Sequence, residues 1–332
     1  MMLQSQFVLQ SSPKQPDHRV KPISLIVGKF ALGAAIVGYI FYKYVDWSTL
    51  EAHVSQSHWI WLLALAIHSV AFRFVTARQI RAGFEPYNIV ARTWPIMEAQ
   101  YISSFCTLIL PGDIVAGGVT WHLLAKDHGH PIHVGSVLIF MRVLNLVALI
   151  PFAMLGIWAE PGLAATQAPL LARIASLGFL VTCLPFVSGR AAREAQRASA
   201  AILKPAKWST AKRLHTRIWE SVHASSRMSA SFKRRLLLYA LGLQLFPIVR
   251  FWMLCAMAGL TLPWSTGLWI VAMLAIVNAL PLTIGGLGVR ELSLVVLFQT
   301  LYSVPAELSI WYSALSFASM ILFSGIPGGF FL

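Results

Sequence analysis

The sequence predicts an all-α polytopic membrane protein, organised as an inverted repeat with about six to eight crossings and two re-entrant helical hairpins. Hydrophobic residues make up 57% of the chain and charged residues only 11%. At least six apolar runs of about 20 residues recur, the length that spans ~30 Å of hydrocarbon. The short alternating segments of an outer-membrane barrel are absent from the sequence, and no water-soluble domain is evident.

The N-terminal region divides into a polar tail and a first crossing. Residues 1–22 are polar and contain three prolines, and we expect them to form a cytoplasmic tail. The apolar run 23–45 is too long for a cleaved signal peptide, so it should remain as a signal anchor. We expect 23–332 to form one transmembrane domain, with halves at about 23–158 and 169–332.

A strongly basic loop sets the orientation. Residues 188–235 carry twelve Lys and Arg side chains against Glu194 and Glu220, so +10 of the formal net charge of +14 lies there. The positive-inside rule places this loop in the cytoplasm. Trp208 and Val222 lie among its basic residues at near-helical spacing, which suggests a helix on anionic headgroups. The alternative is a loop that only sets topology, whereas nucleic acid is a poor fit.

This orientation predicts a re-entrant hairpin in the first half. Residues 159–168 should lie outside and 125–132 inside. The arginine-rich segment 73–92 also looks cytoplasmic. A chain cannot cross once between two cytoplasmic points, so 95–124 should dip into the membrane and return. Its expected interruptions are Leu110-Pro111-Gly112 and Gly117-Gly118.

The second half repeats this plan with the opposite starting side. A break from Pro281 to Gly288 separates two apolar runs and predicts a second hairpin that enters from outside. Paired broken helices near the midplane form the substrate sites of inverted-repeat transporters. The alternative is a set of packing helices with ordinary kinks. The expected runs are 236–259, 265–282, 287–303 and 307–332.

Ionisable side chains inside apolar runs are the candidate site residues, because each costs about 2.5 to 3.5 kcal/mol on insertion and therefore needs a partner or a function. Three arginines among them suit a phosphate, which the planar guanidinium can bind through two donors. Half-helix N-termini after Gly285, Gly286 and Gly288 would add backbone donors. The alternative is internal Arg–carboxylate pairs that fix helix registry. The candidates are Glu98, Asp113, Arg142, Arg250, Arg290 and Glu291.

Other chemistries find little support. The histidines at 122, 128, 130 and 133 lack the tight spacing of known metal-ligand sets, so no metal or other cofactor is expected. No Ser or Cys has a His and an acid in a recognisable catalytic motif. A glycine-rich phosphate loop is also absent from the sequence, which argues against a motor driven by ATP.

The segment Leu280–Glu291 is similar to the P-x3-GGxG-x-RE signature of the lysylphosphatidylglycerol synthase transmembrane-region family, the flippase-like membrane proteins of bacteria and archaea. The closing Ile326-Pro-Gly-Gly329 also resembles the last crossing of that family. The resemblance covers about residues 20–332. It implies a lipid-handling domain of eight segments plus a hairpin, in the inner membrane. The basic side chains Lys14, Arg19 and Lys21 of the tail place the N-terminus in the cytoplasm.

The first half departs from the family pattern. Gly117 and Thr120 stand where the family carries an acid and an Arg, and Asp113 is the nearest substitute for the acid. In the next crossing the Glu-Arg-x2-Asp pattern survives as Met141-Arg142 followed by Asn145. The sequence shows no counterpart of the soluble aminoacyl-transfer domain of two-domain synthases, so we expect no synthesis of lysyl-lipid by this chain alone.

Together, these features favour a flippase-like or lipid-binding transporter for an anionic or polyprenyl-phosphate-type lipid, held by Arg290, Arg142 and Arg250. An enzyme is less favoured. That alternative would be a membrane-embedded enzyme with Glu291 or Asp113 as its acid–base group. A third is a non-catalytic partner of a lipid-modifying enzyme or glycosyltransferase. The lipid's identity, the energy source and the oligomeric state are left open by the sequence.

Overall fold

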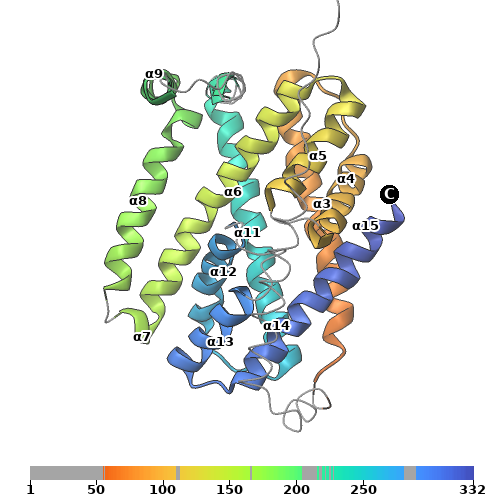
Figure 1. Ribbon diagram of the computed structural model, residues 1–332, viewed down its shortest axis with the longest axis vertical. Helices are drawn as coiled ribbons and strands as arrows, with labels where there is room; N and C mark the ends of the chain where they lie inside the picture. Colours follow the sequence, from red (N-terminus) through yellow and green to blue (C-terminus); the bar gives the residue numbers. More distant parts are fainter. Residues whose placement is uncertain are drawn as a thin grey trace, which may run out of the picture.

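The computed structural model describes residues 55, 57–109, 113–164, 167–203, 215–216, 219–220, 222–223, 226, 228–279 and 289–332. All regular elements in this part of the chain are helices (Figure 1). Several predictions fall outside it, namely the tail 1–22, the first crossing 23–45, the Leu110-Pro111-Gly112 break, the helix near Trp208, and the Pro281-to-Gly288 break with Gly285, Gly286 and Gly288.

Five of the described helical segments are long and apolar enough to cross a bilayer, which confirms an all-α polytopic membrane protein. The longest, α6 and α11, have 29 residues each, about 44 Å at 1.5 Å per residue. The five are α3 (Trp61–Phe84) with the short η1 (Glu85–Tyr87), α6 (Pro131–Ala159), α8 (Ala168–Val187), α11 (Ala230–Ala258), and a last crossing made of α14 (Ala306–Met320), the π-helical turn η3 (Ile321–Gly325) and α15 (Ile326–Phe330).

Four shorter helices lie where the two hairpins are predicted. They are α4 (Thr93–Ile109) and α5 (Asp113–His128), which pack together, and α12 (Trp264–Ala279) and α13 (Val289–Tyr302). Each has 14 to 17 residues, so each is shorter than the ~30 Å hydrocarbon layer. Such lengths suit half-helices. The re-entrant hairpins and the inverted repeat stay predictions.

Two details of the sequence interpretation were wrong. Helix α5 runs through Gly117 and Gly118 without interruption, because two glycines lower helix propensity without removing the backbone donors. Helix α3 continues to Phe84, so Arg73 lies inside a crossing rather than in a cytoplasmic segment. The neighbouring Arg78 and Arg81 had made Arg73 look like part of a basic loop.

The two ends of the bundle carry different connections. The α5–α6 connection lies at the upper end in Figure 1, together with the basic helix α9 (Gly189–Leu203), which runs across the bundle end. The short α7 (Pro161–Ala164) lies at the lower end. This arrangement agrees with the prediction that 125–132 and the basic loop share one side. The cytoplasmic identity of that side stays a prediction.

The outer surface of the bundle is apolar. Helix α8 exposes Leu171, Ile174 and Leu177, as a lipid-facing helix does. Buried side chains form two clusters, one around α4 and the upper part of α6, the other around α11, α12 and α13. Polar side chains gather inside the bundle, where they shape the site described below.

Gly156 and Gly328 are two positions where a glycine lies directly against the backbone of another helix. A Cβ at Gly156 of α6 would lie 2.7 Å from the backbone nitrogen of Trp269 in α12. A Cβ at Gly328 of α15 would collide with the backbone carbonyl of Tyr101 in α4. The Ile326-Pro-Gly-Gly329 segment therefore docks the chain's end directly on α4.

Candidate functional site

A cavity of about 400 Å³ with a largely apolar surface and several polar side chains lies between α3, α4, α5, α11 and the last crossing. Two arginines line it, Arg73 from α3 and Arg250 from α11. Among the described lining residues there is no carboxylate, so the described wall carries positive charge. The other polar lining residues are His68, Ser69, Gln100, Ser103, Ser104, Thr107, Thr120, Ser319 and Ser324.

Arg73 is held by α4. Its Nη2 donates a short hydrogen bond to the hydroxyl of Ser104, and its Nη1 lies 3.4 Å from the backbone carbonyl of Gln100. The guanidinium also stands over the ring of Tyr101, 5.4 Å from its centroid. The Nε of Arg73 is buried and has no hydrogen-bond partner among the described residues. One donor of this arginine therefore remains for another group.

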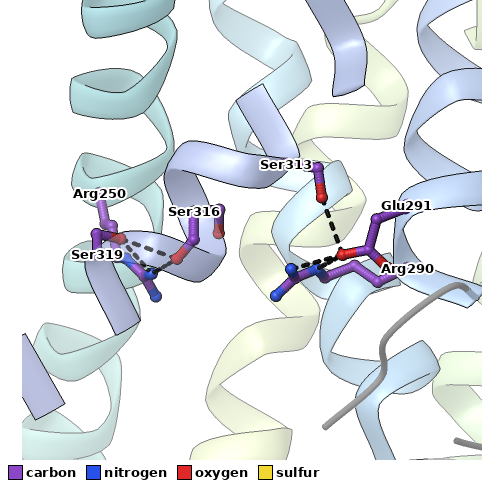
Figure 2. Close-up of polar contacts among 6 residues, drawn as sticks. All are labelled: Arg250, Arg290, Glu291, Ser313, Ser316 and Ser319. Atoms are coloured by element: carbon purple, nitrogen blue, oxygen red, sulfur yellow. Dashed lines mark hydrogen bonds and ion pairs between the residues drawn. The ribbon is translucent and has the colours of Figure 1, made fainter. Parts of the chain in front are cut away.

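Arg250 is held by the last crossing. Its Nη2 donates to the backbone carbonyl of Ser316 at 2.8 Å and to the hydroxyl of Ser319 at 2.9 Å (Figure 2). These contacts come directly before the π-helical turn, and π-turns inside α-helices frequently mark functional sites. Ser69 of α3 donates to the carbonyl of Phe323 within that turn at 3.2 Å. The turn is thus bonded to α3, and the end of α14 directly before it is bonded to α11.

Gln100 belongs to the cavity wall, and its side-chain amide is buried without a partner among the described residues. The residue is 6% exposed, and neither its Nε2 nor its Oε1 has a hydrogen-bond partner among the described residues. A buried amide left this way is costly, by roughly 1 to 3 kcal/mol for each unsatisfied group. Buried polar groups are normally paired with protein or with ordered water.

Arg290 pairs with its neighbour Glu291. Nη2 and Nε of Arg290 approach Oε1 of Glu291 at 2.7 and 3.2 Å, and the hydroxyl of Ser313 donates to the same oxygen at 3.1 Å (Figure 2). Arg290 is 7% exposed and stands over the ring of Phe317, 5.9 Å from its centroid. An acidic partner for Arg290 was one of the two expected outcomes, and Glu291 supplies it.

The structure brings some predicted site residues together and leaves others apart. Arg250 contacts α14 through Ser316, and Arg290 contacts the same helix through the ring of Phe317; Figure 2 shows the two arginines on opposite sides of it. Arg142 is exposed on α6, does not line the cavity, and approaches α5, with Nη1 3.8 Å from the position of a Cβ on Gly117. Asp113 begins α5. The three signature glycines lie outside the described residues.

The sequence interpretation missed Arg73 and Gln100. A signal for the second was present, because Gln100, Ser103, Ser104 and Thr107 recur at helical spacing in an otherwise apolar run. Such a polar stripe inside a membrane helix faces protein or a wet cavity rather than lipid. The stripe lines the cavity.

The histidines engage in ring packing. His133 lies 4.7 Å from the ring of Tyr87 and 5.9 Å from the ring of His130, measured between centroids. Among the described residues, no three His, Cys, Asp or Glu side chains gather in a way that could hold a metal ion.

The arrangement offers guanidinium, hydroxyl and amide groups to an anion in a low-dielectric site, where charge-assisted hydrogen bonds are strong. Among curated proteins and solved structures, none matches the chain. The family described as the lysylphosphatidylglycerol synthase TM region matches residues 26–328, nearly the whole length. The chain is therefore a member of the lysylphosphatidylglycerol synthase transmembrane-region family.

Proposed function

We propose that this protein binds an anionic or polyprenyl-phosphate-type lipid of the inner membrane and moves its headgroup across the bilayer, without ATP. The observation that carries the proposal is the cavity that Arg73 and Arg250 line together with hydroxyl and amide side chains. Both guanidinium groups are fastened by neighbouring helices, so they are oriented before a ligand arrives.

Electrostatics support an anion in this cavity. Two guanidinium groups in one apolar surrounding repel each other, and an anion between them relieves that repulsion. A phosphate has enough acceptor oxygens to take donors from both arginines. Each charge-assisted hydrogen bond contributes roughly 1.5 to 3 kcal/mol in such settings. The outer surface of the bundle is apolar, so the acyl or prenyl chains of the lipid stay in the bilayer while the headgroup occupies the cavity.

The proposal also gives a role to the ion pair between Arg290 and Glu291. Their pair contacts Ser313 of α14, and Arg250 contacts Ser316 and Ser319 of the same helix. A headgroup that competes for either arginine would therefore loosen α14 on one side. We propose that this exchange of partners accompanies transport.

A liposome assay tests the function. The purified protein is reconstituted with a phosphatidylglycerol analogue that is fluorescent on one acyl chain, or with the matching phosphatidylcholine analogue. A membrane-impermeant reductant then bleaches the outer leaflet. With the wild-type protein, analogue from the inner leaflet should reach the outer leaflet and be bleached as well. This second phase of bleaching should be much faster for the anionic analogue than for the zwitterionic one. Equal rates for the two lipids, or no rate above empty liposomes, would sink the proposal.

Variants locate the activity. Arg73→Gln and Arg250→Gln should each slow transport roughly 10- to 100-fold, because each removes a charged donor set. Arg197→Gln is the matched control, since Arg197 is exposed on α9 and pairs with Glu194 there. Mass spectrometry of the recovered lipids separates the alternatives: an altered headgroup would indicate an enzyme, and an unchanged, unmoved lipid would indicate a partner subunit.

A further inference from the structure

The last crossing changes its hydrogen-bond pattern beside the cavity. At the end of α14 the amide of Ile321 donates to the carbonyl of Phe317, four residues earlier. Within the π-turn the amide of Ile326 donates to the carbonyl of Ile321, five residues earlier. The turn therefore holds one residue more than a regular helical turn, and it lines the cavity through Phe323.

The two flanks of the π-turn are fastened to different partners. Before it, the hydroxyl of Ser313 in α14 donates to Glu291 at 3.1 Å. After it, Gly328 of α15 lies against the backbone carbonyl of Tyr101, in a contact that a residue with a side chain would not allow. A rearrangement of the turn that keeps both contacts is therefore confined to the residues between Ser313 and Gly328.

Arg250 holds the segment between these two anchors. Its Nη2 donates to the carbonyl of Ser316 and to the hydroxyl of Ser319, and that hydroxyl itself donates to the carbonyl of Ser316 at 2.9 Å (Figure 2). Ser319 is buried, whereas its neighbour Ala318 is exposed. Successive residues of a helix point about 100° apart, so a shift by one residue would carry Ser319 to the place of Ala318 and away from Arg250.

We propose that the π-turn is a movable step in the last crossing and that Arg250 sets its position. When an anion draws the guanidinium away, the step moves by one turn toward Ser316, and each residue that it passes shifts by one place. Met320 then replaces Ser319 at the cavity wall. A serine tolerates the outward place, because its hydroxyl bonds a carbonyl of its own helix.

This inference rests on the proposed function for its trigger, the anion that competes for Arg250. It gives transport a local rearrangement that leaves both anchors in place. A π-turn suits this role, because its extra residue can be passed along the helix while the helices on either side stay where they are.

Spin labels at two exposed alanines of α14 test the proposal. In a chain without its native cysteines, Ala318→Cys or Ala314→Cys carries a nitroxide, and the protein is placed in lipid nanodiscs. The two positions share one helix face, but only 318 lies in the segment that moves. Dioctanoyl phosphatidylglycerol should lower the accessibility of the label at 318 to oxygen dissolved in the membrane and leave the label at 314 unchanged. Dioctanoyl phosphatidylcholine should change neither.

Arg250→Gln tests the step without a ligand. It removes the charged donors that hold Ser316 and Ser319, so the label at 318 should become less accessible in the ligand-free protein. Arg235→Gln is the matched control, because Arg235 lies on the same helix α11 but pairs with Glu85. It should leave the label at 318 unchanged.

Deletion of Leu322 tests whether transport needs the step. Leu322 is 46% exposed, so little packing is lost with it. Without the extra residue the crossing should form a regular helix, keep its melting temperature and bind dioctanoyl phosphatidylglycerol, but lose transport and the response of the label at 318. Leu322→Ala keeps the length of the crossing and should transport as the wild-type protein does.

The outcomes separate the two claims. If the wild-type protein does not bind the anionic lipid, the proposed function fails, while Arg250→Gln still decides the step: an unchanged label at 318 in that variant overturns it. If the lipid binds and both labels respond, α14 moves as a rigid body and the movable step is overturned. Binding without any response at 318, or normal transport after deletion of Leu322, overturns it as well.

Discussion

Arg250 of α11 donates a 2.8 Å hydrogen bond to the main-chain carbonyl of Ser316 in α14, 66 residues further along the chain. In a regular helix that carbonyl serves the backbone amide of Met320. Directly after it the helix widens into the π-turn Ile321–Gly325. The side chain of Arg250 therefore supports the last crossing where its own backbone pattern changes, and it does so from the cavity wall.

The first prediction concerns Arg290. We expect Arg290→Ala to abolish lipid transport and Arg290→Lys to weaken it, because an ammonium cannot donate from two fixed positions to one carboxylate or phosphate. Transport is measured in liposomes at matched protein abundance. Wild-type transport by Arg290→Ala would remove this residue from the site.

A double variant separates lipid contact from internal pairing. Glu291→Gln alone leaves a buried cation with a weaker partner and should lower stability by about 3 kcal/mol, as breaking buried pairs does. Arg290→Met combined with Glu291→Leu removes the pair as a whole and should recover most of that stability. If the double variant also recovers transport, the pair is only structural.

The second prediction concerns Gly328. Gly328→Ala should lower the unfolding free energy by about 1 to 3 kcal/mol, because the new methyl group must push α15 away from the carbonyl of Tyr101. Gly242→Ala is the matched control: it lies within α11, where a Cβ meets nothing within 4 Å. Thermal unfolding in detergent compares the two. A Gly328→Ala protein as stable as Gly242→Ala would contradict this docking.

The third prediction concerns Glu160, which is 4% exposed at the end of α6. Its Oε2 accepts hydrogen bonds from Ser265 at 2.8 Å and Tyr302 at 2.9 Å, from the start of α12 and the end of α13. In Glu160→Gln, the amide can place its NH₂ group where Oε2 accepts these bonds, and the acceptor is then lost. It can instead place its oxygen there, and the bonds to Ser265 and Tyr302 are then weaker because the oxygen carries no full charge. We expect a loss of roughly 1 to 2 kcal/mol.

Glu194→Gln provides the comparison for Glu160, because Glu194 is exposed and its pair with Arg197 should contribute less than about 1 kcal/mol. Chemical or thermal unfolding of both variants measures the difference. Equal stability of the two proteins would mean that the bonds from the Ser265 and Tyr302 hydroxyls to Glu160 do not hold α6, α12 and α13 together.

The fourth prediction concerns topology. In a chain with Cys106, Cys183 and Cys255 replaced, a cysteine at the exposed Asp127 and one at the exposed Arg190 should react with an impermeant thiol reagent from the same, cytoplasmic side. The reason is that the basic loop follows the positive-inside rule and the α5–α6 connection lies at its end of the bundle. Labelling of position 127 from outside only would exclude the re-entrant hairpin of the first half.

The crossings could be read from the sequence because membrane-spanning length is a local property. Helices α6, α8 and α11 follow apolar runs of the required length. Helix α11 ends one residue before the end of the predicted run 236–259 and begins six residues ahead of it. The signature that ends in Arg290-Glu291 gave the family in the same way, since a motif is contiguous. Arg250 also stood out locally, as a charge in the middle of an apolar run.

The cavity was decided only by tertiary structure. Arg73 and Arg250 come from separate crossings, and Gln100 from a third helix, so no stretch of sequence shows that they share one wall. Nor does the sequence show that Arg290 folds back onto Glu291, because neighbouring residues of a regular helix do not face each other. Hydrophobic length fixes which segments enter the membrane, whereas the contacts between distant helices decide which polar groups meet inside it, and only those contacts make the site.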